Sequence, residues 1–106
     1  MSELVNKLST GIHDIEFETR VENLTDVEKR LENGFIYVKF PKTSGGTELG
    51  INIDTSATKT ANADFKNSKG TIHIEGMCTL DYVKVRCIAD IDISTRQGKG
   101  CLQIIN

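Results

Sequence analysis

The chain has 106 residues, a length typical of one compact domain, and we expect residues 1–106 to form a single domain. Hydrophobic residues make up 38% and charged residues 26% of the sequence, which excludes the composition of a disordered chain. The formal net charge is −2, whereas proteins dedicated to duplex nucleic acids carry an excess of lysine and arginine. Composition therefore disfavours nucleic acid as a partner.

Apolar and cysteine patterns predict the compartment. The first residues lack a basic segment followed by an apolar run, so no signal peptide is expected. No stretch reaches the ~18 consecutive apolar residues of a membrane-spanning helix. The three cysteines, an odd number, show no C-x-x-C spacing. Together these features predict a reduced, cytoplasmic protein with free thiols and no membrane partner.

The N-terminal segments predict a short helix followed by a strand. Residues 2–9 place Leu4, Val5 and Leu8 on one helical face, and such a helix could plug one end of the fold. Residues 13–18 alternate between apolar and acidic side chains, which is typical of a half-buried strand whose acidic side faces solvent.

Residues 25–33 predict the clearest helix. Thr25 and Glu28 have the spacing of a capping box, in which each residue satisfies an unpaired amide of the first turn. Val27 and Leu31 lie one turn apart on an apolar face. Asn33 and Gly34 follow as a left-handed stop.

The remaining segments predict an antiparallel sheet. The expected strands are residues 35–40, 48–54, 71–76, 82–94 and 101–105. The linker "PKTSGGTELG", residues 41–50, carries Lys42 and paired glycines, but it joins two strands and lacks a Gly-Lys-Ser/Thr ending, so it predicts a hairpin turn instead of a phosphate loop. Cys78 is expected in a turn after residue 76, and a second turn is expected at residues 98–100.

Residues 82–94 alternate without a break, with Val85, Cys87, Ala89 and Ile91 on one side. This run is longer than a usual strand, so it must twist strongly or pass around a curled sheet. We therefore expect an α+β fold with a mainly antiparallel sheet of about six strands, partly rolled or barrel-like, with one clear helix and a short N-terminal helix. Residues 55–69 are polar and predict either a mobile connection pinned by Phe65 or a loop that covers a ligand.

Side chains with chemical potential are few. His73 and Glu75 share one face of a strand, and His13 lies inward at the start of another. A metal site would need both histidines and a carboxylate or Cys78 to converge, and nothing in the spacing requires that, so neither metal nor cofactor is expected. Carboxylates two residues apart on strands are interpreted as a solvated face. No nucleophile motif occurs.

The segment "NGFIYVKF", residues 33–40, resembles the RNA-recognition-motif element K/R-G-F/Y-G/A-F-V-x-F/Y. Gly34, Phe35, Val38 and Phe40 match, whereas Asn33 and Ile36 depart from the pattern. In that family a second helix follows this strand, whereas here more strands follow, so the resemblance is confined to these eight residues. Its physical implication is a face carrying Phe35, Tyr37 and Lys39, which stacks bases if it is open and belongs to the core if it is covered. The covered arrangement is favoured.

Three functions remain open. The first is a non-enzymatic binding or accessory protein that acts through protein contacts and is expected to form a homo-oligomer, because apolar residues occupy both faces of several strands, which a second copy would cover. The second is a small-ligand-binding protein or enzyme that uses the interior of a curled sheet, with His13, His73 or Glu75 at its mouth. The third is single-stranded nucleic-acid binding through the aromatic face.

Overall fold

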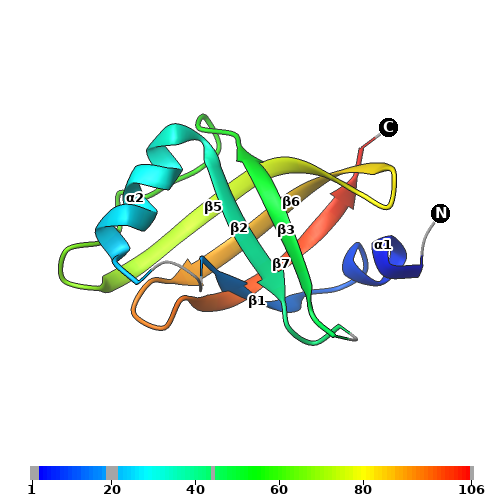
Figure 1. Ribbon diagram of the computed structural model, residues 1–106, viewed down its shortest axis with the longest axis horizontal. Coiled ribbons are helices and arrows are strands. Elements are labelled where there is room, and N and C mark those ends of the chain that lie inside the picture. The colour runs from blue at the N-terminus through cyan, green and yellow to red at the C-terminus, as the bar shows by residue number, and fades with distance from the viewer. Residues whose placement is uncertain (1–2, 19–21, 44, 106) are drawn as a thin grey trace.

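The computed structural model describes residues 3–18, 22–43 and 45–105, which form two short helices and seven strands (Figure 1). In chain order these are α1 (Glu3–Leu8), β1 (His13–Phe17), α2 (Leu24–Asn33), β2 (Phe35–Phe40), β3 (Thr47–Ile53), β4 (Ala63–Asp64), β5 (Lys69–Leu80), β6 (Val83–Asp92) and β7 (Gln97–Ile104). Residue 2, the first of the predicted N-terminal helix, lies outside the described residues. Both predicted helices are therefore present.

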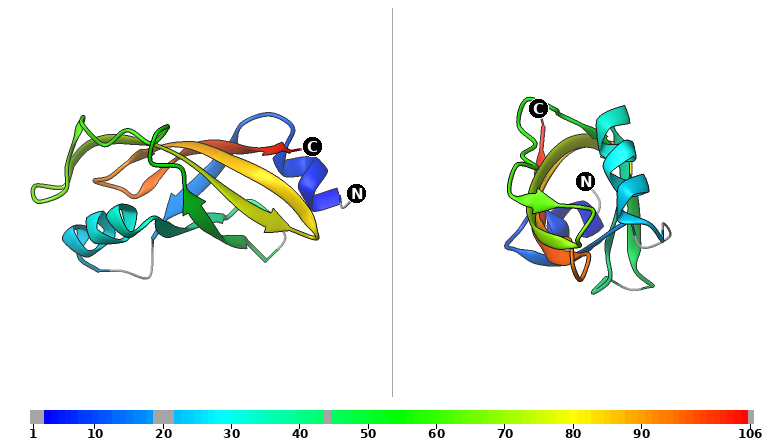
Figure 2. Two further views of the ribbon diagram at one scale, coloured as in Figure 1. Left: turned by 90° about the horizontal axis from the view of Figure 1, so that it is seen from above. Right: turned by 90° about the vertical axis from the view of Figure 1, so that its left-hand side faces the viewer.

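Six strands close into a barrel in which neighbours follow one another along the chain, except where β7 meets β1 (Figure 2). The order is β1, β2, β3, β5, β6, β7 and back to β1, and every pairing is antiparallel. The two-residue β4 lies outside this ring and pairs with the start of β5. The predicted α+β class with a rolled, mainly antiparallel sheet is confirmed.

Inward-facing side chains fill this barrel. An eight-stranded barrel has an interior just wide enough for side chains to fill, and six strands enclose less. Alternate residues of each strand accordingly form one hydrophobic cluster. The strand residues buried in it are Ile15, Phe17, Ile36, Val38, Phe40, Leu49, Ile51, Ile72, Ile74, Val85, Cys87, Ala89, Ile91 and Leu102. The interior is therefore a packed core.

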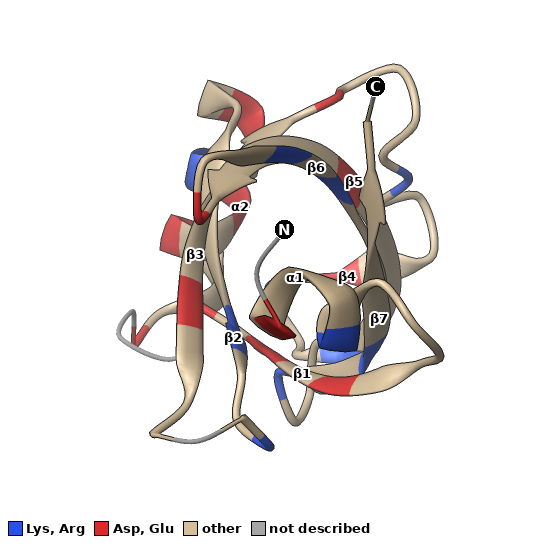
Figure 3. Cartoon of the chain, turned by 90° about the vertical axis from the view of Figure 1, so that its right-hand side faces the viewer, with Lys and Arg blue, Asp and Glu red and all other residues tan. Residues whose placement is uncertain are grey.

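The two helices add to this core. α1 buries Val5 and Leu8 and lies in the mouth of the barrel (Figure 3). α2 buries Val27 and Leu31 and ends at Gly34, whose φ of 86° is left-handed and whose amide donates to the carbonyls of residues 30 and 31. None of the helices in the described ranges is long and apolar enough to cross a membrane.

The predicted capping box of α2 is wrong. The N-cap is Asn23, one residue before the helix, and it makes no side-chain cap hydrogen bond. The backbone carbonyl of Asn23 instead accepts from the amides of Asp26 and Val27 at 3.1 and 3.2 Å. Thr25 is already inside the first turn, where its hydroxyl is not in the N-cap position.

The predicted hairpin at residues 41–46 is confirmed, because β2 and β3 pair with Ile36 opposite Ile51 and Val38 opposite Leu49. Two other turn predictions are wrong. β5 continues to Leu80 and includes Cys78, and its turn is Asp81–Tyr82, both with left-handed φ. This pair of positive φ values suits the twist of a two-residue hairpin.

The second incorrect prediction is the turn at residues 98–100, because these residues lie inside β7. A Cβ atom on Gly98 would lie 1.9 Å from the carbonyl oxygen of Asp90, and one on Gly100 would lie 2.7 Å from that of Ile88. These glycines therefore allow β7 to approach β6 closely and do not mark a turn.

Residues 55–69 are attached to the barrel at several points. Lys59 forms an isolated bridge with His73, and each amide donates to the other residue's carbonyl. β4 pairs with the start of β5, and Phe65 is 5% exposed and joins the core, as predicted.

Gly76 controls the closure of the barrel. It pairs with Ile53, and a Cβ atom there would lie 2.3 Å from the Ile51 side chain and 2.5 Å from the carbonyl oxygen of Asn52. We predict that Gly76→Ala lowers the free energy of unfolding by about 1–3 kcal/mol, because the added methyl forces β3 and β5 apart. Urea unfolding followed by circular dichroism measures this loss.

Gly11→Ala is the comparison variant. Gly11 has a left-handed φ of 75°, and a Cβ atom there would meet no other atom within 4 Å, so its substitution costs only backbone strain. Equal stability losses for Gly76→Ala and Gly11→Ala, with amides of β3 and β5 protected alike in both, would contradict the role assigned to Gly76.

Candidate functional site

The pairing of β3 with β5 is short and, in the described residues, has as few residue pairs as the pairing of β1 with β2. Within the described residues it comprises two pairs, Asn52 opposite Met77 and Ile53 opposite Gly76, whereas β2 and β3 share six pairs and β5 and β6 share ten. The same register would next bring Ile51 opposite Cys78 and Gly50 opposite Thr79. The strands instead separate, and β3 diverges from the β5–β6 hairpin (Figure 2).

This separation leaves a groove of about 510 Å³ between the two strands, which we call the seam groove. It is lined by Glu48, Leu49, Gly50, Asn52, Met77, Cys78, Thr79 and Lys84. Its volume lies within the range of ligand-binding clefts in proteins. Backbone, apolar and charged groups all contribute to its walls, so the groove can accept a ligand that has both a polar backbone and apolar side chains.

The inward-facing side chains of β5 change in burial where β3 departs. Ile72 and Ile74 are each 1% exposed, whereas Cys78 and Leu80 on the same side of the strand are partly exposed. Cys78 is still partly buried, and this burial raises the pKa of its thiol, so the cysteine is a weak nucleophile. The seam groove therefore exposes part of the apolar interior to solvent.

An aromatic pair lies on the outer face of β2 beside this groove. The rings of Phe35 and Tyr37 meet edge to face with centroids 5.2 Å apart, and the residues are 40% and 38% exposed. Phe35 covers Gly50, where a Cβ atom would lie 2.5 Å from its Cζ. Because Gly50 also lines the seam groove, the aromatic pair and the groove form one continuous surface.

The preferred prediction that Phe35 and Tyr37 belong to the core is therefore wrong. α2 contributes its apolar side chains to the barrel interior and does not cover the outer face of β2. Lys39, the third residue of the predicted face, follows on the same side of β2, and its side chain lies against Gly46 of the β2–β3 turn.

His73 and Glu75 meet on the outer face of β5, as their spacing predicted. His73 Nε2 lies 2.7 Å from Glu75 Oε2, and His73 Nδ1 lies 2.8 Å from Asp90 Oδ1 on the neighbouring strand. Hydrogen bonding to Glu75 and then to Asp90 raises the pKa of His73, because both carboxylates favour the imidazolium.

Arg86 extends this group into a charged cluster of five residues, Asp54, His73, Glu75, Arg86 and Asp90. Its guanidinium lies 2.9 Å from Glu75 Oε1 and 2.8 Å from Asp54 Oδ2. The bonds from His73 and Arg86 lower the pKa of Glu75. Hydrogen bonds from Ser56 and Arg86 lower the pKa of Asp54 to about 2. The cluster can hold a proton on His73, but its carboxylates are already paired with cations.

His13 does not join this cluster. It lies on β1, three strands away from β5 around the ring, or roughly 14 Å at the usual spacing between strands. Its Nε2 is 2.8 Å from the carbonyl oxygen of Thr10, and its ring meets Phe40 edge to face. No group of three His, Cys, Asp or Glu side chains is placed to hold a metal ion in the described part of the chain.

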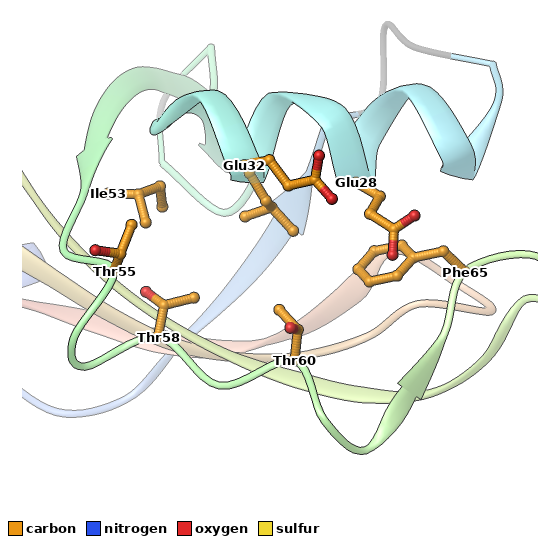
Figure 4. Close-up of a pocket in the computed structure, with 8 residues that line it drawn as sticks. Glu28, Glu32, Ile53, Thr55, Thr58, Thr60 and Phe65 are labelled. Carbon is orange, nitrogen blue, oxygen red and sulfur yellow. The ribbon is translucent and has the colours of Figure 1, made fainter.

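A second cavity of about 190 Å³ lies between α2 and the segment that follows β3 (Figure 4). Its lining residues are Glu28, Leu31, Glu32, Ile53, Thr55, Thr58, Thr60 and Phe65. The Thr58 hydroxyl bonds to the backbone of Glu75, which ties this wall to the charged cluster. The cavity is smaller than usual ligand sites, so it ranks below the seam groove as a candidate.

Glu18 is a residue whose role the alternation pattern missed. It was expected on the solvent side of β1, yet it is 3% exposed because the backbone turns there with a φ of 47°. Its Oε1 accepts from the amide of Tyr37 at 2.6 Å, and its Oε2 lies 3.4 Å from Arg30 of α2. Glu18 thus fixes the backbone that carries the aromatic pair.

Both signs of charge are distributed around the barrel wall (Figure 3), which fits the small net charge. Comparison of the sequence with models of known protein families gives no match, and comparison with curated proteins gives no significant match either. The site must therefore be interpreted from its own geometry.

We predict that His73 contributes to stability in a pH-dependent way. Its folded-state pKa is raised, so its contribution is complete below the unfolded pKa of about 6.5 and is lost as pH rises through the folded value. His73→Gln should therefore destabilise the protein more at pH 5.5 than at pH 9, by less than about 1 kcal/mol. Urea unfolding at the two pH values measures the difference.

Asp90→Asn provides the control, because it removes one carboxylate from His73 and leaves the imidazole in place. NMR titration of the His73 ring should show a lower pKa in this variant than in the wild type. An unchanged titration midpoint would refute the assigned role of Asp90.

Proposed function

We propose that this chain is a non-enzymatic, cytoplasmic binding protein that acts through contacts with another protein. Its contact surface is the seam groove together with the aromatic pair Phe35 and Tyr37. The observation that carries the proposal is the continuity of two half-exposed aromatic rings with an open groove in the wall of an otherwise closed barrel. Aromatic side chains beside a cleft are typical anchors of protein interfaces.

The rival hypothesis of a ligand inside the curled sheet has less support. The strand residues that face inward are packed together as the core, and His73 and Glu75 lie on the outer wall, away from His13. The carboxylates around His73 are engaged with cations, which leaves no free base beside it to accept a substrate proton. A binding role therefore accounts for the geometry better than catalysis does.

We predict that random linear peptides displayed on phage and selected on the wild-type protein bind this surface. Phe35→Ala should weaken the selected peptides about tenfold or more, because truncating an interface aromatic usually costs over 1 kcal/mol. Isothermal titration calorimetry with synthetic copies of the peptides measures the change in affinity.

Ile12→Ala is the matched control, because Ile12 is an exposed apolar residue, 69% accessible, outside the proposed surface. It should leave peptide affinity unchanged. Failure to enrich any peptide, or equal losses with Phe35→Ala and Ile12→Ala, would reject the proposed function.

A second copy of the chain is one partner that the sequence predicts. Sedimentation velocity over a wide concentration range tests it. A monomer at every concentration would remove self-association and leave a different protein as the partner.

A second candidate function is single-stranded nucleic-acid binding, favoured by the exposure of Phe35 and Tyr37 on the face that also carries Lys39. It predicts that a fluorescein-labelled oligodeoxythymidine binds in a salt-dependent way and that Tyr37→Ala weakens binding by about 1–3 kcal/mol. Fluorescence anisotropy at two salt concentrations measures both effects. Indifference of binding to Tyr37→Ala and Phe35→Ala would end this candidate.

A further inference from the structure

We infer that the seam groove recognises an extended polypeptide segment by adding it as a strand to the open edges of β3 and β5. This inference rests on the proposed function and specifies its partner as a segment recognised through its backbone. Four features of the groove support it: the direction of the backbone groups, the open register, the exposed interior and the shape of the opening.

The direction of the backbone groups follows from the bonds at the closed part of the seam. The amide of Asp54 donates to the carbonyl of Glu75 at 2.9 Å, whereas the amide of Ile53 donates to Gly34 on the β2 side at 2.8 Å. In antiparallel strands the backbone groups of successive residues point to opposite edges. Gly50, four residues before Asp54, therefore directs its N–H and C=O toward the seam.

The same reasoning applies to β5. The backbone groups of Glu75 point to β3, so those of Met77 and Thr79 point to the same edge. The backbone groups of Cys78 and Leu80 point to β6. Gly50 and Thr79 are the next hydrogen-bonding positions of the β3–β5 register, yet that pairing stops at Asn52 and Met77. Two strand edges thus face the groove with backbone groups that their neighbour in the ring does not engage.

The exposed interior defines the side chains that the segment must carry. Leu49 and Cys78 line the groove on the inner side, and Leu80 beyond them is partly exposed. On the outer side lie Thr79 and Gly50, and the Phe35 ring rests on Gly50. Because side chains of a strand alternate between faces, the segment should carry an apolar residue toward the core and a residue that contacts Phe35 at the next position.

The shape of the opening favours a single extended segment over a whole second barrel as the occupant of the seam groove. β3 and β5 are joined at Gly76 and separate beyond it, so the two edges form a wedge closed at one end. A single extended segment needs a spacing of about 4.8 Å from each neighbour, whereas a whole barrel presents a curved wall that the wedge cannot admit. Lys84 lies on the groove wall, where an acidic side chain of the segment can pair with it.

The test compares two substitutions at Thr79. Thr79→Pro removes the seam-facing N–H, and proline is tolerated at an edge where that group is not used within the sheet. Thr79→Val removes the hydroxyl but keeps the N–H and the strand propensity. The peptides selected on the wild-type protein should bind Thr79→Val within about twofold of wild type and Thr79→Pro at least about tenfold more weakly.

The outcomes separate the inference from the proposed function. Equal binding to Thr79→Pro and Thr79→Val, with Phe35→Ala still damaging, would overturn strand addition and leave the contact surface intact. Absence of any selected peptide would overturn both. Peptides that lose affinity in Thr79→Pro but not in Thr79→Val support the inference.

A measurement on the peptide keeps the test independent of the folding of Thr79→Pro. N-methylation of any single amide in the bound segment should weaken binding, because successive amides of the inserted strand point to β3 and to β5 in turn and both edges are engaged. In the wild-type protein, the Gly50 and Thr79 amides should exchange with solvent faster than those of Ile51 and Cys78 and become protected when peptide is bound. Uniform tolerance of N-methylation, or unchanged exchange at Gly50 and Thr79, would overturn strand addition.

Discussion

The close contact between β3 and β5 at Gly76 is the constraint on which this fold depends. A barrel has no free edges only if the strands at the two ends of its rolled sheet meet. Here those strands are β3 and β5, which meet through two residue pairs at Gly76, where a side chain would collide with Ile51. All other pairings in the ring can form in a flat or open sheet. The contact at Gly76 therefore distinguishes a closed barrel from a curled sheet with two exposed edges.

The same contact explains why the candidate site lies where it does. The strands are held at one end of the seam and separate at the other, so the groove, the half-exposed Cys78 and the aromatic ring resting on Gly50 are all consequences of a short closure. Because the interior is packed, chemistry and recognition are left to the outer wall. There the charged cluster around His73 ties Asp54, which follows β3, to Arg86 of β6 and Glu75 of β5.

Periodic features were predictable from the sequence, whereas features that depend on distant strands were not. The unbroken alternation around Cys87 predicted β6 and its buried side, and Gly34 predicted the end of α2, because both effects are local. The sequence predicts a turn at Gly98, because the pattern does not distinguish a glycine needed for close strand contact from a glycine in a loop.

In the candidate site, too, local features were predictable from the sequence and features that depend on distant strands were not. The shared face of His73 and Glu75 follows from their spacing, but Asp90 enters only through the register of β5 and β6. Whether Phe35 is covered depends on which side of β2 receives α2, and no local pattern determines this. Glu18 departs from the alternation of β1 because its backbone turns where Tyr37 and Arg30 arrive from later in the chain. The seam groove itself is a property of register and has no signature in the sequence.

The pairing of β1 with β7 has a consequence for how the molecule is made. His13 lies opposite Gly100, so β1 must wait for β7, which is synthesised much later, before its second edge is covered. Until then a nascent chain holds a row of adjacent hairpins with an uncovered border at each end, a condition in which neighbouring chains can join edge to edge. The synthesis of β7 is therefore the step that covers the second edge of β1 and removes it as a place where copies of this polypeptide could join.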